Sequence, residues 1–192
     1  MRQTAGRGRM GRAWASAPRA VAASLALRPR WPEDCWPRLT LTAGLAARRA
    51  LGEAVSLEWP NDLVAAGLKV GGLLTEARGG VVAVGLGVNL YWPEPTVEGA
   101  GALYEADPGP EAALEVAGAW AADLLGRASR PPDVWGRDEY AACCATLGRE
   151  VTWEPAGRGR AVAVGVDGGL EVETEGVRRV LYAGEVHTVR PA

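Results

Sequence analysis

The spacing of apolar positions changes several times along the chain, and each spacing predicts a different kind of element. Residues 36–50 and 111–127 carry apolar side chains at roughly helical intervals, so both segments are predicted to be helices. A further helix is expected within 133–147. The first helix is expected to end near Gly52, because glycine is favoured just after a helix C-terminus.

Short apolar runs bounded by turn residues predict strands. A buried strand is expected at 21–27, and another at 55–59. The chain is expected to leave the sheet at Pro60, because proline cannot donate a hydrogen bond to a central ladder. An antiparallel meander with one buried face and tight turns is expected at 63–66, 68–77 and 81–90.

The pattern changes again from Gly148, where glycines separate short β-prone runs. These runs predict a small barrel of about five strands, at 150–153, 161–166, 170–174, 177–182 and 186–189. The predicted fold class is therefore α+β, with a mixed or antiparallel sheet, flanking helices and a small β-barrel. Two domains are expected, at 1–146 and 147–192.

Composition narrows the classes of partner. The 192 residues are 48% hydrophobic, enough for a buried core, and carry a formal net charge of -2. This balance predicts no general attraction to nucleic acid or to an anionic membrane. The sequence also lacks an uninterrupted apolar stretch of the roughly eighteen residues that predict a membrane-spanning helix. Nucleic acid and membrane are therefore not expected as partners.

Cysteine and histidine restrict the chemistry further. Cys35, Cys143 and Cys144 are odd in number, and two are adjacent, which argues against a disulfide framework and favours a reducing compartment, the cytoplasm. His187 is the single histidine, so a multi-histidine metal site is excluded and a Ser-His-Asp triad would have to use this residue. We predict no metal site built from protein ligands.

The basic residues are unevenly divided between two types. Of 21 lysines and arginines, only Lys69 is a lysine. A lysine that persists against such a bias suggests a position that needs a compact ammonium instead of a planar guanidinium, although chance is the simpler alternative.

An Arg/Gly segment opens the chain. The first 30 residues hold seven arginines and no acidic residue, a composition that transit peptides share. Gly6, Gly8 and Gly11 interrupt any amphipathic helix, so we expect a loop whose amides and guanidinium groups surround an anion. The alternative is a solvated segment or one that contacts nucleic acid. Trp14 favours the first view, because an indole can stack on a purine or cover a ligand.

Two later segments carry polar residues next to predicted strands. The Asn61-Asp62 pair follows a strand, where either a site or a locally capped turn is expected. Gly72 and Gly85 lie inside predicted strands, which indicates a bulge or the close approach of a ligand. Lys69 follows Asn61 across one hairpin, so both side chains can face one cavity.

In this order, the segments resemble the catalytic domain of biotin-protein ligases. The matching residues are Gly6-Arg7-Gly8-Arg9-Met10-Gly11-Arg12-Ala13-Trp14, Trp59-Pro60-Asn61-Asp62, Lys69-Val70-Gly71-Gly72-Leu73-Leu74-Thr75-Glu76 and Gly85-Leu86-Gly87-Val88-Asn89. The resemblance covers nearly the whole chain, since the segment from Gly148 resembles the SH3-like C-terminal domain of that family. It implies a fold related to class II aminoacyl-tRNA synthetases and lipoate ligases.

The same resemblance implies an activity. Biotin and ATP would form biotinyl-AMP, with Mg²⁺ bridging the triphosphate, and biotin would pass to a lysine of a biotin carboxyl carrier protein of acetyl-CoA carboxylase or a related carboxylase. A homodimer formed through the sheet is one option that the resemblance leaves open.

Individual roles follow from the resemblance as well. Lys69 and Arg9 would be catalytic, and a fixed Lys69 ammonium would stabilise charge that develops on the phosphoryl oxygens. Asp62 would position its loop or a magnesium ion. The biotin site would comprise Gln3, Gly6, Arg7, Gly8, Arg9, Lys69 and Gly72. The ATP and adenylate site would comprise Arg9, Arg12, Trp14, Asn61, Asp62, Lys69, Gly85 and Asn89.

The sequence also departs from the family pattern. Family members carry a strand and a Ser-Thr segment ahead of the glutamine that corresponds to Gln3, whereas Met1 lies two residues before it here. We therefore expect weaker biotin binding, and a start codon further upstream. Arg19-Ala20 stands where the family often has Gly-Gly, and Glu58 where a lysine is common. No winged-helix domain is expected, so the predicted ligase does not bind an operator.

Three alternatives remain open from sequence. A non-catalytic remnant would bind a ligand or partner protein without turnover. A lipoate-protein ligase is the nearest enzyme alternative, although the Arg/Gly loop and the C-terminal barrel favour biotin. Binding of RNA by the Arg/Gly loop is the third, and it would show as salt-dependent affinity for nucleic acid.

Overall fold

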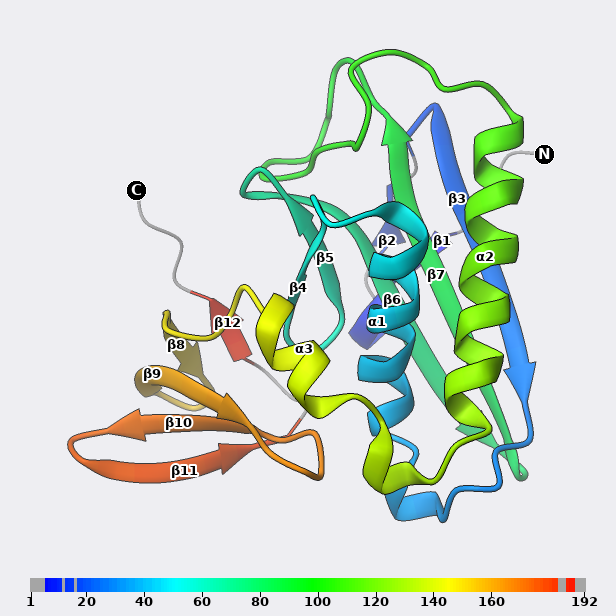
Figure 1. The fold of residues 1–192 in the computed structure, drawn as a ribbon. Helices are drawn as coiled ribbons and strands as arrows, with labels where there is room; N and C mark the ends of the chain where they lie inside the picture. The colour runs from blue at the N-terminus through cyan, green and yellow to red at the C-terminus, as the bar shows by residue number, and fades with distance from the viewer. Residues whose placement is uncertain (1–5, 12, 16, 183–185, 189–192) are drawn as a thin grey trace.

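The computed structural model describes residues 6–11, 13–15, 17–182 and 186–188. These residues form two five-stranded β-sheets and a two-stranded hairpin, with helices packed on the first five-stranded sheet (Figure 1). Two of the predicted site residues, Gln3 and Arg12, lie outside the described residues. The α+β architecture predicted from the sequence is confirmed.

The first sheet is antiparallel, with strand order β3-β7-β6-β5-β4. The predicted meander forms β5 to β7. The chain leaves the sheet after β4 and re-enters it at β5, so the predicted exit near Pro60 is a short turn within one hairpin. The strands are β3 (Arg19–Leu27), β4 (Ser56–Glu58), β5 (Asp62–Ala65), β6 (Leu68–Arg78) and β7 (Val81–Tyr91).

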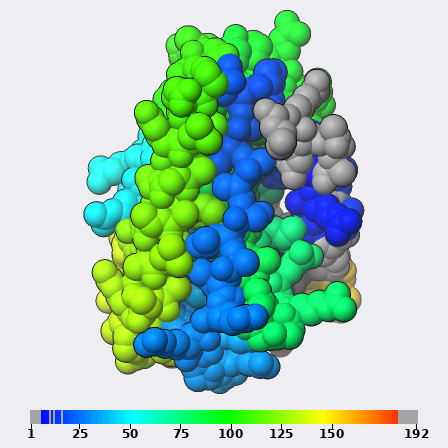
Figure 2. Space-filling view, turned by 90° about the vertical axis from the view of Figure 1, so that its right-hand side faces the viewer, coloured from blue at the N-terminus to red at the C-terminus, as the bar shows by residue number. Residues whose placement is uncertain are grey.

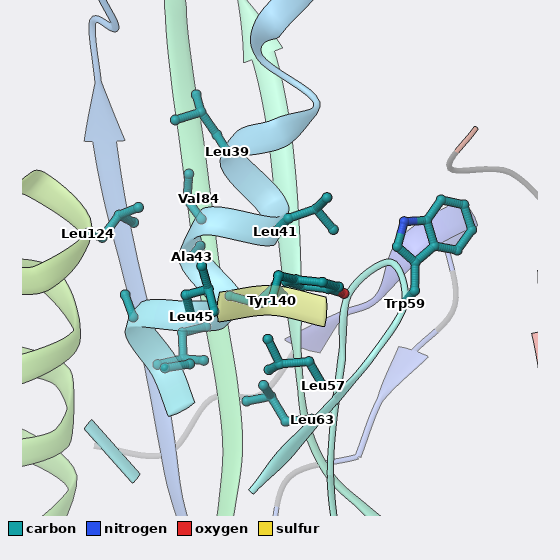
Figure 3. Close-up of a cluster of buried hydrophobic side chains, with 14 of the residues drawn as sticks. Leu39, Leu41, Ala43, Leu45, Leu57, Trp59, Leu63, Val84, Leu124 and Tyr140 are labelled. Carbon is teal, nitrogen blue, oxygen red and sulfur yellow. The ribbon is translucent and has the colours of Figure 1, made fainter. Parts of the chain in front are cut away.

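Two long helices, α1 (Arg38–Leu51) and α2 (Glu111–Ala128), pack on one face of this sheet, as predicted. The core between them and the sheet is a cluster of fully buried aliphatic side chains, among them Leu39, Leu45 and Val84 (Figure 3).

The opposite face of the sheet carries a short N-terminal hairpin. It consists of β1 (Gly6–Arg7) and β2 (Ala13–Trp14), joined by the 3₁₀ turn η1 (Arg9–Gly11). Figure 2 faces the edge strand β3, which runs vertically, with α2 on one side of that strand and the dark blue hairpin on the other. The hairpin is the structure adopted by the predicted Arg/Gly loop.

The third helix is shorter than the predicted 133–147. A 3₁₀ turn, η3 (Pro132–Val134), precedes α3 (Arg137–Cys143), and Gly136 between them has a φ of +101° that no α-helix contains. After α3 the chain runs beside β4, where Leu57 and Cys144 form a parallel bridge. An earlier 3₁₀ turn, η2 (Glu33–Cys35), leads into α1.

The second sheet has strand order β11-β10-β9-β8-β12, and it fits the expected small C-terminal strand-rich domain. Its β9 begins earlier than the predicted 161–166, because glycines there allow the neighbouring backbone to approach closely: a Cβ on Gly159 would lie 2.5 Å from the Glu173 carbonyl oxygen. The boundary between residues 146 and 147 stays a prediction. The strands are β8 (Glu150–Trp153), β9 (Gly157–Val164), β10 (Leu170–Thr174), β11 (Val177–Leu181) and β12 (Val186–Thr188).

Within the described ranges, no helix is both long and apolar enough to cross a membrane. Cys35 and Cys144 are buried in the core, and Cys143 is partly buried.

Candidate active site

A cavity of about 500 Å³ lies between the N-terminal hairpin and the sheet. Its base is formed by β3, β6 and β7, and its far end by the segment after β7. Ten of the predicted site residues line it: Arg7, Gly8, Arg9, Trp14, Asn61, Asp62, Lys69, Gly72, Gly85 and Asn89. Gly6 is predicted as part of the site but is not among the lining residues; it pairs with Trp14 in the hairpin ladder.

A bulge in β6 brings Lys69 into this cavity. The register with β5 shifts between Leu63 and Val64, which face Gly71 and Lys69, so Val70 is left as the extra residue. Residues three apart on a regular strand face opposite sides. Because of the bulge, Lys69 and Gly72 line the same cavity, while Val70 is buried in the core.

A continuous chain of polar contacts runs along one wall of the cavity. Arg9 donates from Nη1 to Asn61 Oδ1 at 2.8 Å, and Asn61 Nδ2 donates to Asp62 Oδ1 at 3.0 Å. Asp62 Oδ2 in turn accepts a hydrogen bond from Lys69 Nζ at 2.6 Å. The Asn61 amide also donates to the Leu73 carbonyl oxygen, so the turn between β4 and β5 is fastened to β6. The wall therefore holds a lysine ammonium in a defined place between β5 and the hairpin.

Glycines form the floor beneath the hairpin. A Cβ on Gly87 would lie 3.2 Å from the Trp14 ring, and one on Gly72 would lie 3.6 Å from it, so the indole rests directly on the strand backbones. The Lys69 ammonium lies 5.9 Å from the centroid of the same ring, within range of a cation–π contact. A Cβ on Gly71 would lie 2.7 Å from the Gly87 carbonyl oxygen, so β6 and β7 approach too closely for any other residue at this position.

Asn89 lies at the end of the cavity near the segment that follows β7. Its side chain is only 2% exposed, and its Nδ2 donates to the Gly101 carbonyl oxygen at 3.0 Å. Its Oδ1 has no hydrogen-bond partner among the described residues. Because an unpaired buried acceptor costs about 1 to 3 kcal/mol, this oxygen suits a ligand that brings a donor.

The segment after β7 was not predicted as part of the site. Lys69 and Asn89 pair with it through their backbones: Lys69 N–H donates to the Gly99 carbonyl oxygen, and Leu103 N–H donates to that of Asn89. Its prolines by themselves indicate only an irregular connection. The small side chains on β3 were not predicted as lining residues either. A run of small residues after a loop that contains a tryptophan could have indicated them. The missed lining residues include Ala22, Ala23, Ser24, Trp92, Val97 and Ala100.

The outer end of the 92–110 segment is tied to β3 by an ion pair. Arg19 donates from Nε and Nη2 to the two carboxylate oxygens of Asp107, both at 2.8 Å. Gly109 N–H donates to the same carboxylate at 2.9 Å. The hydrogen bonds from Arg19, and then that from Gly109, lower the pKa of Asp107 to about 2. Arg19 thus supplies a contact to the segment that forms the far end of the cavity.

A second cavity, of about 510 Å³, adjoins the first at Arg9 and Asn61. It lies between α1, the Trp59-Pro60 end of the β4–β5 hairpin and the turn between β9 and β10. The described residues contain no group of three histidine, cysteine or acidic side chains placed to hold a metal ion. Asp62 is the acidic side chain on the lining of the first cavity.

Comparison with known proteins points to one group. The model of the biotin/lipoate A/B protein ligase family matches residues 1–90. The bifunctional ligase/repressor BirA of Bacillus subtilis and a biotin–[acetyl-CoA-carboxylase] ligase of Paracoccus denitrificans are each 41% identical over 99 residues, 46% of this chain. The match covers 30% and 41% of those proteins, so the chain spans less than half the length of these relatives.

A solved structure resembles the chain over nearly its full length. The biotin protein ligase from Aquifex aeolicus in complex with biotin and ATP is 30% identical, with a TM-score of 0.81. The match covers 99% of this chain and 87% of that one, and therefore includes the second sheet as well as the first.

Proposed function

Because this chain belongs to the biotin protein ligase family, we propose that it forms biotinyl-AMP from biotin and ATP and transfers the biotin to a lysine of a carrier protein. The observation that carries this proposal is the Lys69 ammonium, held by Asp62 at 2.6 Å in a cavity that a glycine floor keeps open. The nature of the relatives supports the choice of substrates, since the Aquifex protein was solved with biotin and ATP.

In the first step, the biotin carboxylate attacks the α-phosphorus of ATP, and pyrophosphate leaves. Lys69 would stabilise the negative charge that builds on the phosphoryl oxygens, since a preorganised cation acts most strongly where charge develops. Arg9 would add a second cation and, through Asn61, keep the hairpin closed against the turn that carries Asp62. The Asp62 carboxylate would release the ammonium as the phosphate arrives.

The two substrates would lie side by side over the same floor. We assign biotin to Arg7, Gly8 and Gly72, and the adenosine to Gly85 and Asn89, which flank Gly87, the ladder partner of Gly72. The unpaired, buried Asn89 Oδ1 fits a donor such as the exocyclic amino group of adenine. Trp14 would cover the adenylate, as an indole on a glycine floor can.

Magnesium fits this arrangement in one limited way. Mg²⁺ usually keeps several waters and binds through one or two carboxylates together with substrate phosphates. Asp62 is placed to supply such a carboxylate. When bound, the ion would neutralise charge on the triphosphate.

In the second step, the amine of the carrier's lysine attacks the acyl carbon of the mixed anhydride, and AMP leaves. No covalent enzyme intermediate is required. We infer a biotin carboxyl carrier protein as the partner and the cytoplasm as the compartment, which three free cysteines suit. A homodimer stays a prediction, which sedimentation of the purified chain would measure.

Streptavidin-detected labelling of a biotin carboxyl carrier domain, with biotin, ATP and Mg²⁺, tests the proposal. We expect labelling by the wild type and loss of labelling in Lys69→Ala. Lipoate in place of biotin serves as the control for the alternative ligase activity. Biotin binding without biotin-dependent pyrophosphate release would instead identify a protein that binds ligand without turnover.

A further inference from the structure

The turn between β9 and β10, residues 165–169, reaches from the second sheet into the first domain. It is compact: Gly165 N–H donates to the Gly169 carbonyl oxygen at 2.8 Å, and Gly168 N–H to that of Gly165 at 3.0 Å. It also lies tightly against α1, since a Cβ on Gly168 would come within 2.9 Å of a Leu41 methyl carbon.

Two tryptophans of the first domain donate to carbonyl oxygens of this turn. Trp135 Nε1 bonds the Val166 carbonyl oxygen at 2.9 Å, and Trp59 Nε1 bonds that of Gly168 at 3.0 Å. Both indoles are buried, with 2% and 3% of their surface exposed. The two bonds are chemically alike, but the tryptophans lie in different places. Trp135 packs edge-on against Tyr140 of α3, whereas Trp59 stands at the turn of the β4–β5 hairpin (Figure 3).

Trp59 is held by the C-terminal part of the chain at a second point. Its backbone N–H donates to Thr146 Oγ1 at 2.8 Å, and Thr146 is fully buried at the start of the connection to β8. Asn61 follows two residues later, and it contacts both Arg9 and Asp62. The position of Trp59 therefore sets where the turn that orients Lys69 begins.

The space around Trp59 leaves this position sensitive to its hydrogen bonds. The second cavity is lined by Trp59, Pro60 and Asn61 on one side and by Asp167 and Gly168 on the other. An indole without its partner could tilt into this space and carry the adjoining turn with it. Trp135 lines neither of these two cavities.

We propose that the 165–169 turn is a positioning element for the Asn61-Asp62 turn, and that it acts through Trp59 as the positioning residue. This inference rests on the proposed ligase function. It gives the second sheet a part in adenylate formation without any contact with the substrates: the sheet fixes the geometry in which Asp62 presents the Lys69 ammonium.

The test compares Trp59→Phe with Trp135→Phe, since each loses one indole N–H bond to the same turn and keeps an aromatic ring. The full chain is assayed for biotin-dependent pyrophosphate release with ATP and Mg²⁺, and its unfolding is followed by denaturant. We expect similar shifts in unfolding midpoint for both variants. For Trp59→Phe we expect a kcat lower by roughly 10- to 100-fold with little change in either KM, because small misplacements of catalytic groups have effects of that size. For Trp135→Phe we expect a kcat within about twofold of wild type, since the turn that carries Asp62 is untouched.

Equal losses of kcat in both variants would reduce the turn to a structural contact and overturn the proposal, as would an unchanged kcat in a folded Trp59→Phe. If Trp59→Phe does not fold, Thr146→Val takes its place, because it removes the other partner of Trp59 while keeping its shape. A wild type that releases no pyrophosphate would refute the ligase function instead. The positioning role is then judged by crystal structures of the two variants: a Lys69–Asp62 contact kept in both contradicts it, and one lost only in Trp59→Phe supports it.

Discussion

The two walls of the cavity are built in opposite ways. One wall is a chain of charged and polar side chains from Arg9 through Asn61 and Asp62 to Lys69, each held by its neighbour. The other wall, called the glycine wall below, consists of the strand glycines of the floor and of the 92–110 segment, which pairs with the strands through its backbone. Asn89 offers one unpaired acceptor there among the described residues. A site can therefore place its charges on a few side chains of one wall, while the facing wall leaves room for the ligand and carries almost no charge.

The charged wall should be the more sensitive of the two to substitution. Lys69→Ala is expected to lower kcat for biotin-dependent pyrophosphate release by roughly 100- to 1000-fold, the effect of removing a preorganised charge-stabilising donor. Lys69→Arg should not restore it, because a planar guanidinium does not replace a compact ammonium. Steady-state kinetics measure both variants. Arg49→Ala is the control: Arg49 pairs with Asp123 at the surface and lies outside the cavity lining, so its kcat should equal that of wild type. If the kcat of Lys69→Ala were within a few-fold of the wild-type value, the reaction would not depend on this wall.

Gly71 lies behind the glycine wall, on the core side of β6, and does not line the cavity itself. A substitution there should therefore change stability before it changes rate. Gly71→Ala places a methyl group 2.7 Å from the Gly87 carbonyl oxygen, which is backbone and cannot swing aside. We expect a loss of about 1 to 3 kcal/mol in the free energy of unfolding, as for other overpacked sites. Denaturant unfolding is compared with that of Gly85→Ala, where the nearest atom would lie at an ordinary 3.6 Å. Equal stabilities of the two variants would show that the close approach of β6 and β7 does not set the floor.

Asn89 tests whether the glycine wall recognises the nucleotide. Asn89→Ala is expected to raise KM for ATP by about tenfold and to leave KM for biotin near its wild-type value, since one buried hydrogen bond is worth about 1 to 3 kcal/mol. Thr42→Val is the matched control, because it removes another buried polar group, on α1 and away from both cavities. A parallel rise in both KM values in Asn89→Ala would assign the residue to general packing.

The ion pair at the outer end of the second wall should give the smallest effect. Asp107→Asn is expected to raise KM for ATP by at most about fivefold, since exposed pairs contribute little. The pKa of Asp107 is lowered in the folded protein, from an ordinary 3.8 to about 2. The contribution of the carboxylate to stability is therefore present above about pH 4 and lost as pH falls toward 2. Thermal unfolding of wild type and Asp107→Asn across this range should show the difference between their unfolding midpoints shrinking as pH falls. A difference that stays constant down to pH 2 would show that the ion pair does not contribute to stability.

The ordered motifs made most of this site predictable. Local spacing located the helices and the meander, and the resemblance gathered Arg9, Asn61, Lys69 and Asn89, which line one cavity in the structure. Their individual roles stay predictions. The same spacing could not show that α3 is shortened, because Gly136 adopts a positive φ and packs so closely that a Cβ would lie 2.7 Å from a Leu45 methyl carbon.

Long-range contacts account for what the sequence could not reveal. The 92–110 segment carries no motif, and only its backbone pairing with Lys69 and Asn89 places it on the cavity. The link between Trp59 and Gly168 joins residues 109 positions apart, through an indole that the sequence showed only as the end of a strand and the start of a motif. Neither contact has a periodic signal, so neither could be found without the fold.

The bulge at Val70 bears on which genetic changes this segment tolerates. Replacement of Val70 by another apolar residue would leave the register of β6 as it is. Deletion of this one residue would restore regular alternation and turn the lysine toward the face that α1 covers, where an ammonium would be desolvated. The residues around Val70 can therefore change in type but not in number. A single-codon deletion there should lower activity as much as loss of the lysine itself.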